Sequence, residues 1–272
     1  MSEAELLADA RRALQEAGIE DPVREVRLLW RASFPKRYEE YDDAMAGGRV
    51  ASFRDLVARR AAREPMSHLT GRRDFYEHQF EVNANVLDPR PDTECLVIAA
   101  LEQPFSRVLD MGTGTGCILL SLLAARPETS GVGSDLSDTA LVVAARNTAL
   151  LELDHRTSLI VSDWFSDVVG TFDLIVSNPP YIAADEMAGL SPEVLHEPRM
   201  ALTDEGDGLS CYRIIASGAP IHLSAGGWLM VEIGPTQAAA VVAMFETAGL
   251  VNVEIRQDLD GRDRVILGQK PL

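Results

Sequence analysis

Residues 174–181 read Leu174-Ile175-Val176-Ser177-Asn178-Pro179-Pro180-Tyr181. The first three are apolar and mostly β-branched, as expected for a strand that is covered on both faces of a sheet. The two prolines prevent further strand pairing, and a residue that precedes a proline is restricted to an extended conformation. The sequence therefore predicts a buried strand that ends at Asn178, at the edge of an α/β sheet where ligands bind.

The residues after this strand can hold a planar –NH2 group. Asn178 offers a side-chain carbonyl as acceptor, and Pro179 offers a main-chain carbonyl without an N–H beside it. Tyr181 adds a flat, apolar face. We therefore expect this segment to bind an amide or an exocyclic amine and to present its nitrogen to a reaction partner. The alternative is a simple turn that ends a core strand, because short motifs also occur by chance.

The region upstream alternates predicted strands with predicted helices, a pattern typical of a parallel sheet with crossover helices. Four successive strands end in glycine or polar residues: Asp110 with the loop Gly112-Thr113-Gly114-Thr115-Gly116, then Asp135, then Asp163 with Trp164, then Asn178. One acid at such a place is usually a helix cap or part of a solvated loop. Because parallel strands end at the same sheet edge, the four together indicate a binding site.

A glycine loop followed by an acid about 20 residues later fits either a dinucleotide or S-adenosylmethionine. The spacing favours S-adenosylmethionine, because the dinucleotide pattern is G-x-G-x-x-G whereas these glycines alternate. Asp110 would repel a pyrophosphate but suits an ammonium group. Asp135 can accept hydrogen bonds from ribose hydroxyls, and Asp163 can accept one from an adenine amine while Trp164 packs on the ring.

These residues resemble the class I S-adenosylmethionine-dependent methyltransferases that methylate amino groups, and most closely the HemK/PrmC family. Several motifs carry the resemblance: Pro89-Arg90-Pro91-Asp92-Thr93-Glu94, residues 110–116, residues 162–165, residues 178–181, Glu197-Pro198, Ala201-Leu202, residues 206–209 and Arg264-Val265. Asp88 and Glu77 depart from the family pattern, which has an apolar residue and a glycine there. The resemblance implies a Rossmann-like, mostly parallel sheet with a C-terminal antiparallel hairpin, and a small N-terminal helical domain.

The resemblance also implies an activity. Members of the family transfer a methyl group from S-adenosylmethionine to the side-chain nitrogen of the glutamine in the Gly-Gly-Gln motif of peptide chain release factors, leaving S-adenosylhomocysteine. Carried over by motif, the catalytic residues are Asn178, Pro179 and Tyr181, and Pro180 joins them in binding the substrate. The residues expected to bind the cofactor are Arg90, Asp110, the loop 112–116, Asp135, Asp163, Trp164 and Asn178.

The chain is expected to form a helical substrate-docking domain (residues 1–64), a β-hairpin linker (65–95) and the methyltransferase domain (96–272). The first domain contains predicted helices over residues 2–17, from Asp21-Pro22 onward, and over about 51–63. A structural cap is an equally good interpretation of this domain. A further helix is expected from Glu94, capped by Asp92 or Thr93.

Composition limits the partners and the compartment. The net charge of −17 over 272 residues disfavours direct binding to nucleic acid, with only weak basic clusters around Arg59-Arg60, Arg63 and Arg72-Arg73. The acidic N-terminus and the lack of a long apolar run predict a cytoplasmic protein that does not bind membranes. Scattered histidines and three distant cysteines predict no metal site. We expect a monomer.

Three other functions fit part of the sequence. A sister family methylates a glutamine on a ribosomal protein, and the sequence does not distinguish that substrate. Adenine N6-methylation would use the same pair of acceptors, but the negative charge opposes it. A non-catalytic binder of S-adenosylmethionine would have no use for Asn178-Pro179-Pro180-Tyr181.

Overall fold

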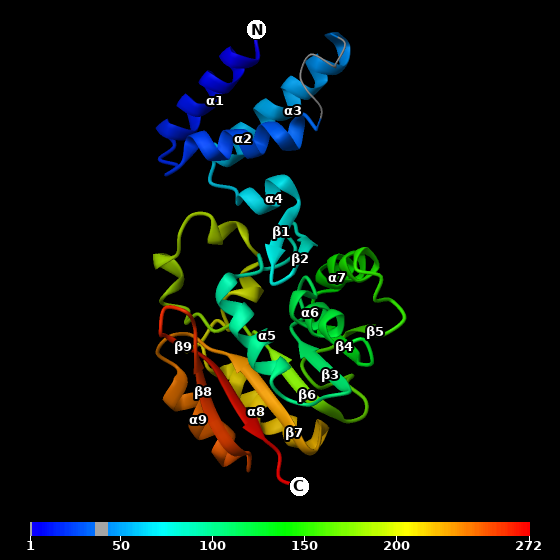
Figure 1. The fold of residues 1–272 in the computed structure, drawn as a ribbon. Helices are drawn as coiled ribbons and strands as arrows, with labels where there is room; N and C mark the ends of the chain where they lie inside the picture. The colour runs from blue at the N-terminus through cyan, green and yellow to red at the C-terminus, as the bar shows by residue number, and fades with distance from the viewer. Residues whose placement is uncertain (1, 36–42) are drawn as a thin grey trace. The chain divides into compact units, whose positions relative to one another are not determined.

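The computed structural model describes residues 2–35 and 43–272, and the chain divides into two compact units. One unit comprises Met1–Arg72 with Ser191–His196, and the other comprises Arg73–Leu190 with Glu197–Leu272. Each unit has its own hydrophobic core. Figure 1 labels the elements of both along the chain.

The first unit is helical. It contains α1 (Glu3–Glu16), α2 (Pro22–Ser33), α3 (Asp43–Ala61) and α4 (Met66–Thr70). The predicted start of α2 is confirmed, because the Asp21 carboxylate accepts a hydrogen bond from the Arg24 N–H at 3.0 Å and Pro22 occupies the first turn. The apolar sides of the helices meet in a core that includes Leu14, Leu29 and Phe53, each at most 1% exposed.

The third helix is longer than the sequence predicts. It begins at Asp43 rather than near residue 51, and it ends at Ala61. Apolar periodicity starts only near Phe53, and the preceding turns contain Gly47 and Gly48, which are poor helix formers. The apolar periodicity that predicts a helix is therefore absent from the first half of α3.

The unit boundaries also differ from the expected division, which ended the first domain at residue 64. A distant segment, Ser191–His196, belongs to the helical unit. Glu193 pairs with Arg60 at 3.1 Å and with Arg63 at 2.9 Å, and the His196 Nε2 lies 3.2 Å from the Ala62 carbonyl oxygen. Such ion pairs across more than 100 residues leave no local pattern in the sequence.

The second unit is built on a sheet of seven strands in the order β5-β4-β3-β6-β7-β9-β8. The strands are β3 (Arg107–Met111), β4 (Ser130–Asp135), β5 (Thr157–Val161), β6 (Phe172–Ser177), β7 (Leu223–Glu232), β8 (Val251–Gln257) and β9 (Asp263–Gln269). The first five in sheet order are parallel, whereas β9 is antiparallel to β7 and pairs with β8 as a hairpin. The predicted fold class is confirmed.

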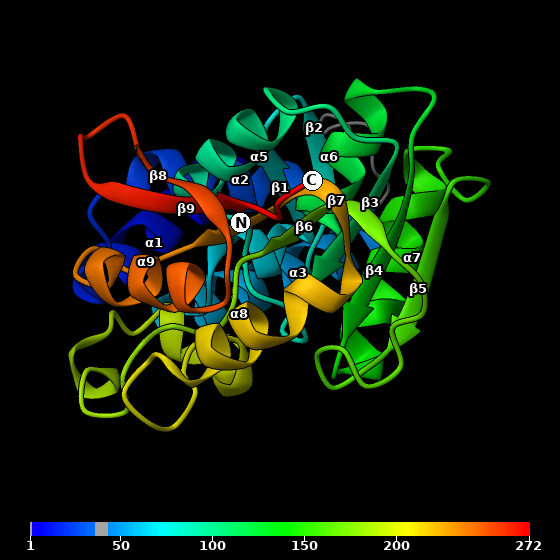
Figure 2. The same ribbon diagram turned by 90° about the horizontal axis from the view of Figure 1, so that it is seen from below.

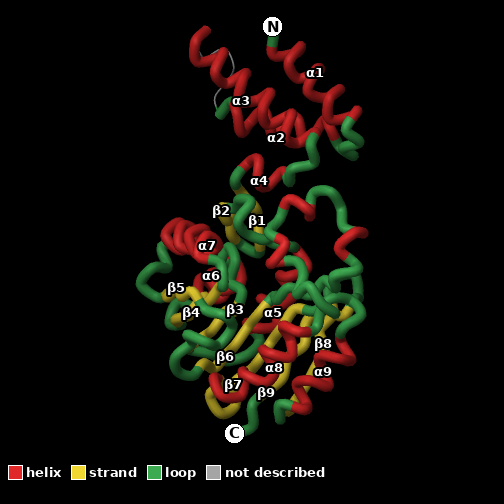
Figure 3. The backbone as a smooth tube through the Cα atoms, turned by 180° about the vertical axis from the view of Figure 1, so that it is seen from behind, coloured by secondary structure: helices red, strands yellow, loops and turns green. Residues whose placement is uncertain are grey.

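Helices cover both faces of this sheet (Figures 2 and 3). The helices are α5 (Glu94–Leu101), α6 (Cys117–Ala125), α7 (Asp138–Leu150), α8 (Ser210–His222) and α9 (Ala238–Thr247). Alternate strand residues enter different cores, as the two-residue period of a strand requires. Leu174 and Val176 of β6 pack with α5 and α6, whereas Ile175 packs with α8 and α9.

A two-stranded hairpin, β1 (Arg72–Phe75) with β2 (His78–Glu81), precedes α5, as predicted for the linker. Three arginines of the weak basic clusters pair with acids: Arg59 with Glu64, Arg60 with Glu25 and Glu193, and Arg73 with Asp88. No helix within residues 2–35 and 43–272 has the length and apolar character needed to cross a bilayer. In the same ranges, no cluster of three or more metal-binding side chains occurs.

Gly131 in β4 provides a test of this packing. A Cβ at Gly131 would lie 2.5 Å from the Leu119 Cδ1 and 3.2 Å from the Val108 carbonyl oxygen, so Gly131→Ala should lower the free energy of unfolding by about 1–3 kcal/mol. As a control, Gly48→Ala in α3 meets nothing within 4 Å and should be neutral or slightly stabilising. Thermal unfolding of both variants measures the effect, and equal melting temperatures would contradict the packing described here.

Candidate active site

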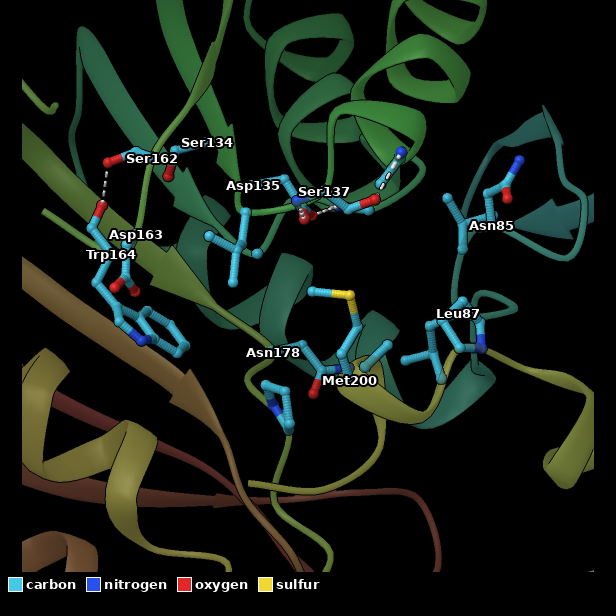
Figure 4. Close-up of a pocket in the computed structure, with 18 residues that line it drawn as sticks. Asn85, Leu87, Ser134, Asp135, Ser137, Ser162, Asp163, Trp164, Asn178 and Met200 are labelled. Carbon is cyan, nitrogen blue, oxygen red and sulfur yellow. Dashed lines mark hydrogen bonds between the residues drawn. The ribbon is translucent and has the colours of Figure 1, made fainter. Parts of the chain in front are cut away.

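A cavity lies at the carboxyl ends of β3, β4, β5 and β6, with about 800 Å³ of empty volume that is partly open to solvent. This volume is typical of a site for a small molecule or cofactor. The predicted site residues that line it are Gly112, Gly114, Asp135, Asp163, Trp164, Asn178 and Pro180. Figure 4 shows Trp164 and Asp163 at one end of the cavity and Asn85 and Leu87 at the other.

The other predicted site residues do not line the cavity. They are Arg90, Asp110, Thr113, Thr115, Gly116, Pro179 and Tyr181. Several lining residues had no clear signal in the sequence, among them Asn85, Ser134, Ser137 and Met200. Pro198 and Ala201 also line the cavity, and they belong to motifs that carry the family resemblance.

The glycine loop is held against the end of β4. Gly112, Gly114 and Gly116 have φ values of 67°, 54° and 80°, a region that residues with a side chain rarely adopt. The Asp135 carboxylate accepts hydrogen bonds from the N–H groups of Gly114 and Ser137, both at 2.9 Å. Burial raises the pKa of Asp135, and these N–H groups oppose that shift. Asp135 therefore fixes the loop while it lines the cavity.

Asp110 lies at the base of the loop and is fully buried. Its Oδ2 accepts a hydrogen bond from the Thr113 hydroxyl at 2.7 Å, whereas its Oδ1 has no hydrogen-bond partner. Burial raises the pKa of Asp110 to about 7, and the Thr113 hydroxyl opposes the shift. A buried carboxyl with an unsatisfied oxygen is a favourable neighbour for a donor or a cation.

Trp164 adopts a conformation that is unusual for a residue with a large side chain, with φ of 50°. The Ser162 hydroxyl donates to the Trp164 carbonyl at 2.8 Å and accepts from the Asp167 N–H at 3.0 Å. These bonds keep the turn after β5 closed, so that Asp163 and Trp164 both line the cavity. Backbone strain of this kind is commonly found at functional sites.

The Asn178 amide has a defined partner on one side only. Its Nδ2 donates to the Thr93 hydroxyl oxygen at 3.2 Å, and its Oδ1 forms no hydrogen bond with any part of the chain that the structure describes. As predicted, α5 begins at Glu94 with Thr93 in the N-cap position, but the Thr93 side chain makes no capping hydrogen bond. A 3₁₀ turn over Pro91–Thr93 leads directly into the helix, and the Thr93 hydroxyl is directed to Asn178 instead.

Tyr181 turns away from the cavity. Its hydroxyl donates to the Glu232 Oε1 at 3.4 Å, and its main-chain carbonyl accepts from the Gln237 side chain at 2.9 Å. Burial and the nearby Glu232 carboxyl raise the pKa of Tyr181. Sequence reasoning missed Glu232, although it is an acid at the end of a parallel strand, which is the same signal that identified Asp135.

Arg90 joins two segments that border the cavity. Its guanidinium donates to the Glu197 Oε1 at 2.5 Å, and Glu197 also accepts from the Asp88 N–H at 3.3 Å. Asn85–Leu87 precede this contact and Pro198–Ala201 follow it, and both segments contribute to the cavity wall. The structure thus places Arg90 in a supporting ion pair rather than on the cavity. Asp88, the departure from the family pattern, lies 3.5 Å from the Arg73 guanidinium.

Removing Arg90 should cost more stability than removing a surface arginine. The Glu197 side chain is only 1% exposed, so Arg90→Ala leaves a buried acid unpaired and should lower the free energy of unfolding by about 3 kcal/mol. Arg146→Ala is the matched control, because its pair with Glu81 is exposed on both sides and should contribute less than about 1 kcal/mol. Chemical denaturation of both variants distinguishes them, and equal losses would contradict the supporting role.

Asp110 should make stability depend on pH. The pKa of Asp110 is about 7 in the folded protein, whereas the ordinary value is 3.8. The protonated carboxyl therefore contributes its full stability below about pH 4, and this contribution is lost as the pH rises through about 7. The side chain of Asp110→Asn cannot titrate. From about pH 5 to about pH 8, the free energy of unfolding of the variant should therefore rise by a few kcal/mol relative to that of wild type. Glu232 titrates in both wild type and variant, so its contribution cancels in the difference between their free energies of unfolding. A pH-independent difference in melting temperature would show that Asp110 ionises normally.

Both parts of the chain match known families. Residues 5–71 match the family described as PrmC N-terminal domain, and residues 88–233 match the family described as Methyltransferase small domain. A solved methyltransferase from Pyrococcus furiosus has a TM-score of 0.55 at 16% identity, covering 71% of this chain and 89% of that one. At that identity the likeness concerns the fold alone.

Curated relatives extend over nearly the whole chain. A release factor glutamine methyltransferase from Cereibacter sphaeroides is 49% identical, covering 97% of this chain and 98% of that protein. One from Rhodospirillum rubrum is 43% identical, covering 94% of this chain and 82% of that protein. Since the identity is high along the full length of both domains, the chain belongs to the release factor glutamine methyltransferase family, the HemK/PrmC family that its motifs resemble.

Proposed function

We propose that the protein transfers a methyl group from S-adenosylmethionine to the side-chain nitrogen of the glutamine in the Gly-Gly-Gln motif of peptide chain release factors. The observation that carries the proposal is the Asn178 amide, whose nitrogen is held by Thr93 and whose oxygen is unengaged beside the cavity. A glutamine side chain ends in the planar –NH2 group that such an acceptor fits. The names of the curated relatives support the same substrate.

The residues around the cavity fit S-adenosylmethionine. Asp135 is placed to accept from ribose hydroxyls with the lone pairs that the loop leaves free. Trp164 offers an aromatic face for adenine, with Asp163 as an acceptor for its amine. Gly112 and Gly114 allow the backbone to approach the ligand closely. The unpartnered Oδ1 of Asp110 supplies negative charge beneath the loop, which favours the ammonium group of the methionine part.

The remaining predicted cofactor residues act indirectly in this proposal. Thr113 holds the Asp110 carboxyl, and the Thr115 carbonyl accepts from the Asn147 amide at 2.9 Å, which fixes the end of the loop. Gly116 is the N-cap residue that precedes α6, and it has a positive φ. Arg90 acts through Glu197 on the segments that border the cavity. These residues shape the site rather than contact the ligand.

Catalysis rests on the orientation of a poor nucleophile. The lone pair of an amide nitrogen is delocalised, so the chain must hold the nitrogen in the geometry of attack. The Asn178 Oδ1 and the Pro179 carbonyl each accept one of the two amide hydrogens. Positioning of this kind lowers a barrier by up to about 7–11 kcal/mol in favourable cases. Bound S-adenosylmethionine supplies the electrophilic methyl group.

The same two acceptors stabilise the positive charge that develops on the nitrogen. No general base is required before the transfer, because the nitrogen is a stronger acid once it carries the methyl group and loses its proton afterwards. Tyr181 and Pro180 shape the substrate side of the site, with Tyr181 fixed by Glu232 and Gln237. We place the reaction in the cytoplasm, where release factors act, and assign substrate docking to the helical unit.

The test is methyl transfer from labelled S-adenosylmethionine to a purified release factor. Label should appear on the release factor and be absent when the glutamine of its Gly-Gly-Gln motif is changed to alanine. Absence of label on both, while the protein still binds S-adenosylmethionine, would contradict the proposed substrate. Label on a ribosomal protein or on adenine in DNA would then support the alternative acceptors.

Asn178→Ala tests the mechanism. Loss of one charge-stabilising acceptor should lower kcat by about 10²–10³-fold, while S-adenosylmethionine binding, measured by calorimetry, should stay close to wild type. Gln79→Ala, an exposed amide on β2, is the control and should leave both unchanged. A fall in cofactor affinity as steep as the fall in kcat would assign Asn178 to cofactor binding instead.

A further inference from the structure

One motif that carries the family resemblance, residues 206–209, has no part in the site described so far. It lies beside the chain that follows residues 178–181, which we call the acceptor segment. There the Ala184 N–H donates to the Gly206 carbonyl at 3.0 Å. The motif is therefore placed to act on the end of the acceptor segment.

The Gln237 side chain joins this motif to the acceptor segment. Its Nε2 donates to the carbonyl oxygens of Tyr181 and Gly208, at 2.9 Å and 3.1 Å. Its Oε1 accepts from the main-chain N–H of Gly234 at 2.9 Å. Main-chain groups have a fixed polarity, so these three partners determine which way the amide is turned. Gln237 therefore holds the Tyr181 carbonyl in one place.

Two glycines leave the space for this contact. Gly208 has a φ of 74°, and a Cβ there would collide with the Tyr181 carbonyl oxygen and lie 2.9 Å from the Gln237 Nε2. A Cβ at Gly234 would lie 3.0 Å from the Gln237 Oε1 and 3.3 Å from the Tyr181 Cδ2. Glycine is thus required at both positions for the close approach of the chain.

The Asp204 carboxylate fixes the loop that presents Gly208. Its Oδ1 accepts from the N–H groups of Gly206 and Gly208, both at 2.9 Å, and its Oδ2 accepts from the Ser210 N–H at 2.9 Å. Hydrogen bonds from N–H groups to a carboxylate are among the strong ones. Gly208 is thus held by its N–H from within the loop, while its carbonyl accepts from Gln237.

The acceptor segment is anchored at both ends. At its start, Ser177 pairs with Met111 in the sheet, and the Ser177 hydroxyl donates to the Met111 carbonyl at 2.7 Å. At its end, Gln237 holds the Tyr181 carbonyl. The two prolines between these anchors have a restricted φ, so few dihedral angles remain free. The place of the Tyr181 carbonyl therefore limits where the Pro179 carbonyl can lie.

We propose that Gln237 and Gly208 are positioning residues that fix the acceptor segment through the Tyr181 carbonyl. This inference rests on the proposed function and assigns the residues that place its two acceptors, the Asn178 amide and the Pro179 carbonyl. Neither Gln237 nor Gly208 lines the cavity, so both act on methyl transfer rather than on S-adenosylmethionine binding. A displacement of about 1 Å in a positioned group can lower a rate by about 10²-fold.

Gln237→Met tests the inference, because methionine keeps the length of glutamine and removes its N–H donors. Gln269→Met is the matched control. Gln269 is also half-buried and donates to a main-chain carbonyl, that of Gly226 at 2.9 Å, but it lies in β9 and does not line the cavity. With a saturating release factor, Gln237→Met should lower kcat by about 10–100-fold, and Gln269→Met should stay close to wild type. S-adenosylmethionine affinity should be unchanged in both.

A second pair of variants separates the collision with Tyr181 from backbone strain. Gly208 and Gly249 have φ values of 74° and 83°, so alanine is strained at both positions. Nothing lies within 4 Å of a Cβ at Gly249, whereas a Cβ at Gly208 would meet the Tyr181 carbonyl. Gly208→Ala should therefore lower kcat by about 10–100-fold, and Gly249→Ala should lower only the melting temperature.

All kcat values are compared at a temperature at which the melting curves show every variant to be folded. Equal kcat values within either pair of variants would mean that the residue is merely structural and would overturn the inference. A loss of S-adenosylmethionine affinity as steep as the loss of kcat would overturn it as well. Wild type in the same assay keeps the two questions apart, because the proposed function fails only if wild-type protein does not methylate the Gly-Gly-Gln glutamine.

Discussion

The parallel pairing of β3 with β6 is the constraint on which the site depends. The register sets Met111 beside Ser177, so the two strands end together. The next residues are Gly112, which opens the glycine loop, and Asn178, which begins the segment that we propose to bind the substrate. The Ser177 hydroxyl donates to the Met111 carbonyl at 2.7 Å and closes the gap between the strand ends. The segments that we propose to bind cofactor and substrate are thus adjacent because of strand register, before any side chain contributes.

The strand ends could be predicted from the sequence because the signals are local. Apolar, β-branched runs end at glycine, acid or proline, and parallel pairing brings such ends to one edge. Asp135, Asp163, Trp164 and Asn178 were found in this way, and the structure brings all four to one cavity. What the sequence could not supply was the orientation of side chains one layer behind that edge.

Thr93 and Tyr181 illustrate the missing information. The Thr93 position matches a helix cap by local chemistry, yet a half-buried amide 85 residues away uses its hydroxyl instead. Tyr181 has the apolar face expected of a pocket wall, but the buried Glu232 attracts its hydroxyl. In both cases a long-range partner outweighs the local preference, because a buried polar group that is left unpaired is costly.

Two buried carboxyls, Asp110 and Glu232, contact the glycine loop and Tyr181, respectively. Burial raises the pKa of each to about 7, so both lower the stability of the ligand-free protein at neutral pH. Two hydroxyls limit the cost, because Thr113 donates to Asp110 at 2.7 Å and Tyr181 donates to Glu232 at 3.4 Å. In each pair the hydroxyl donates to the acid, so the acid fixes the direction of that hydroxyl. Each acid therefore holds a side chain of a segment that we propose to bind cofactor or substrate, which is a reason to keep these acids buried rather than replace them with apolar residues.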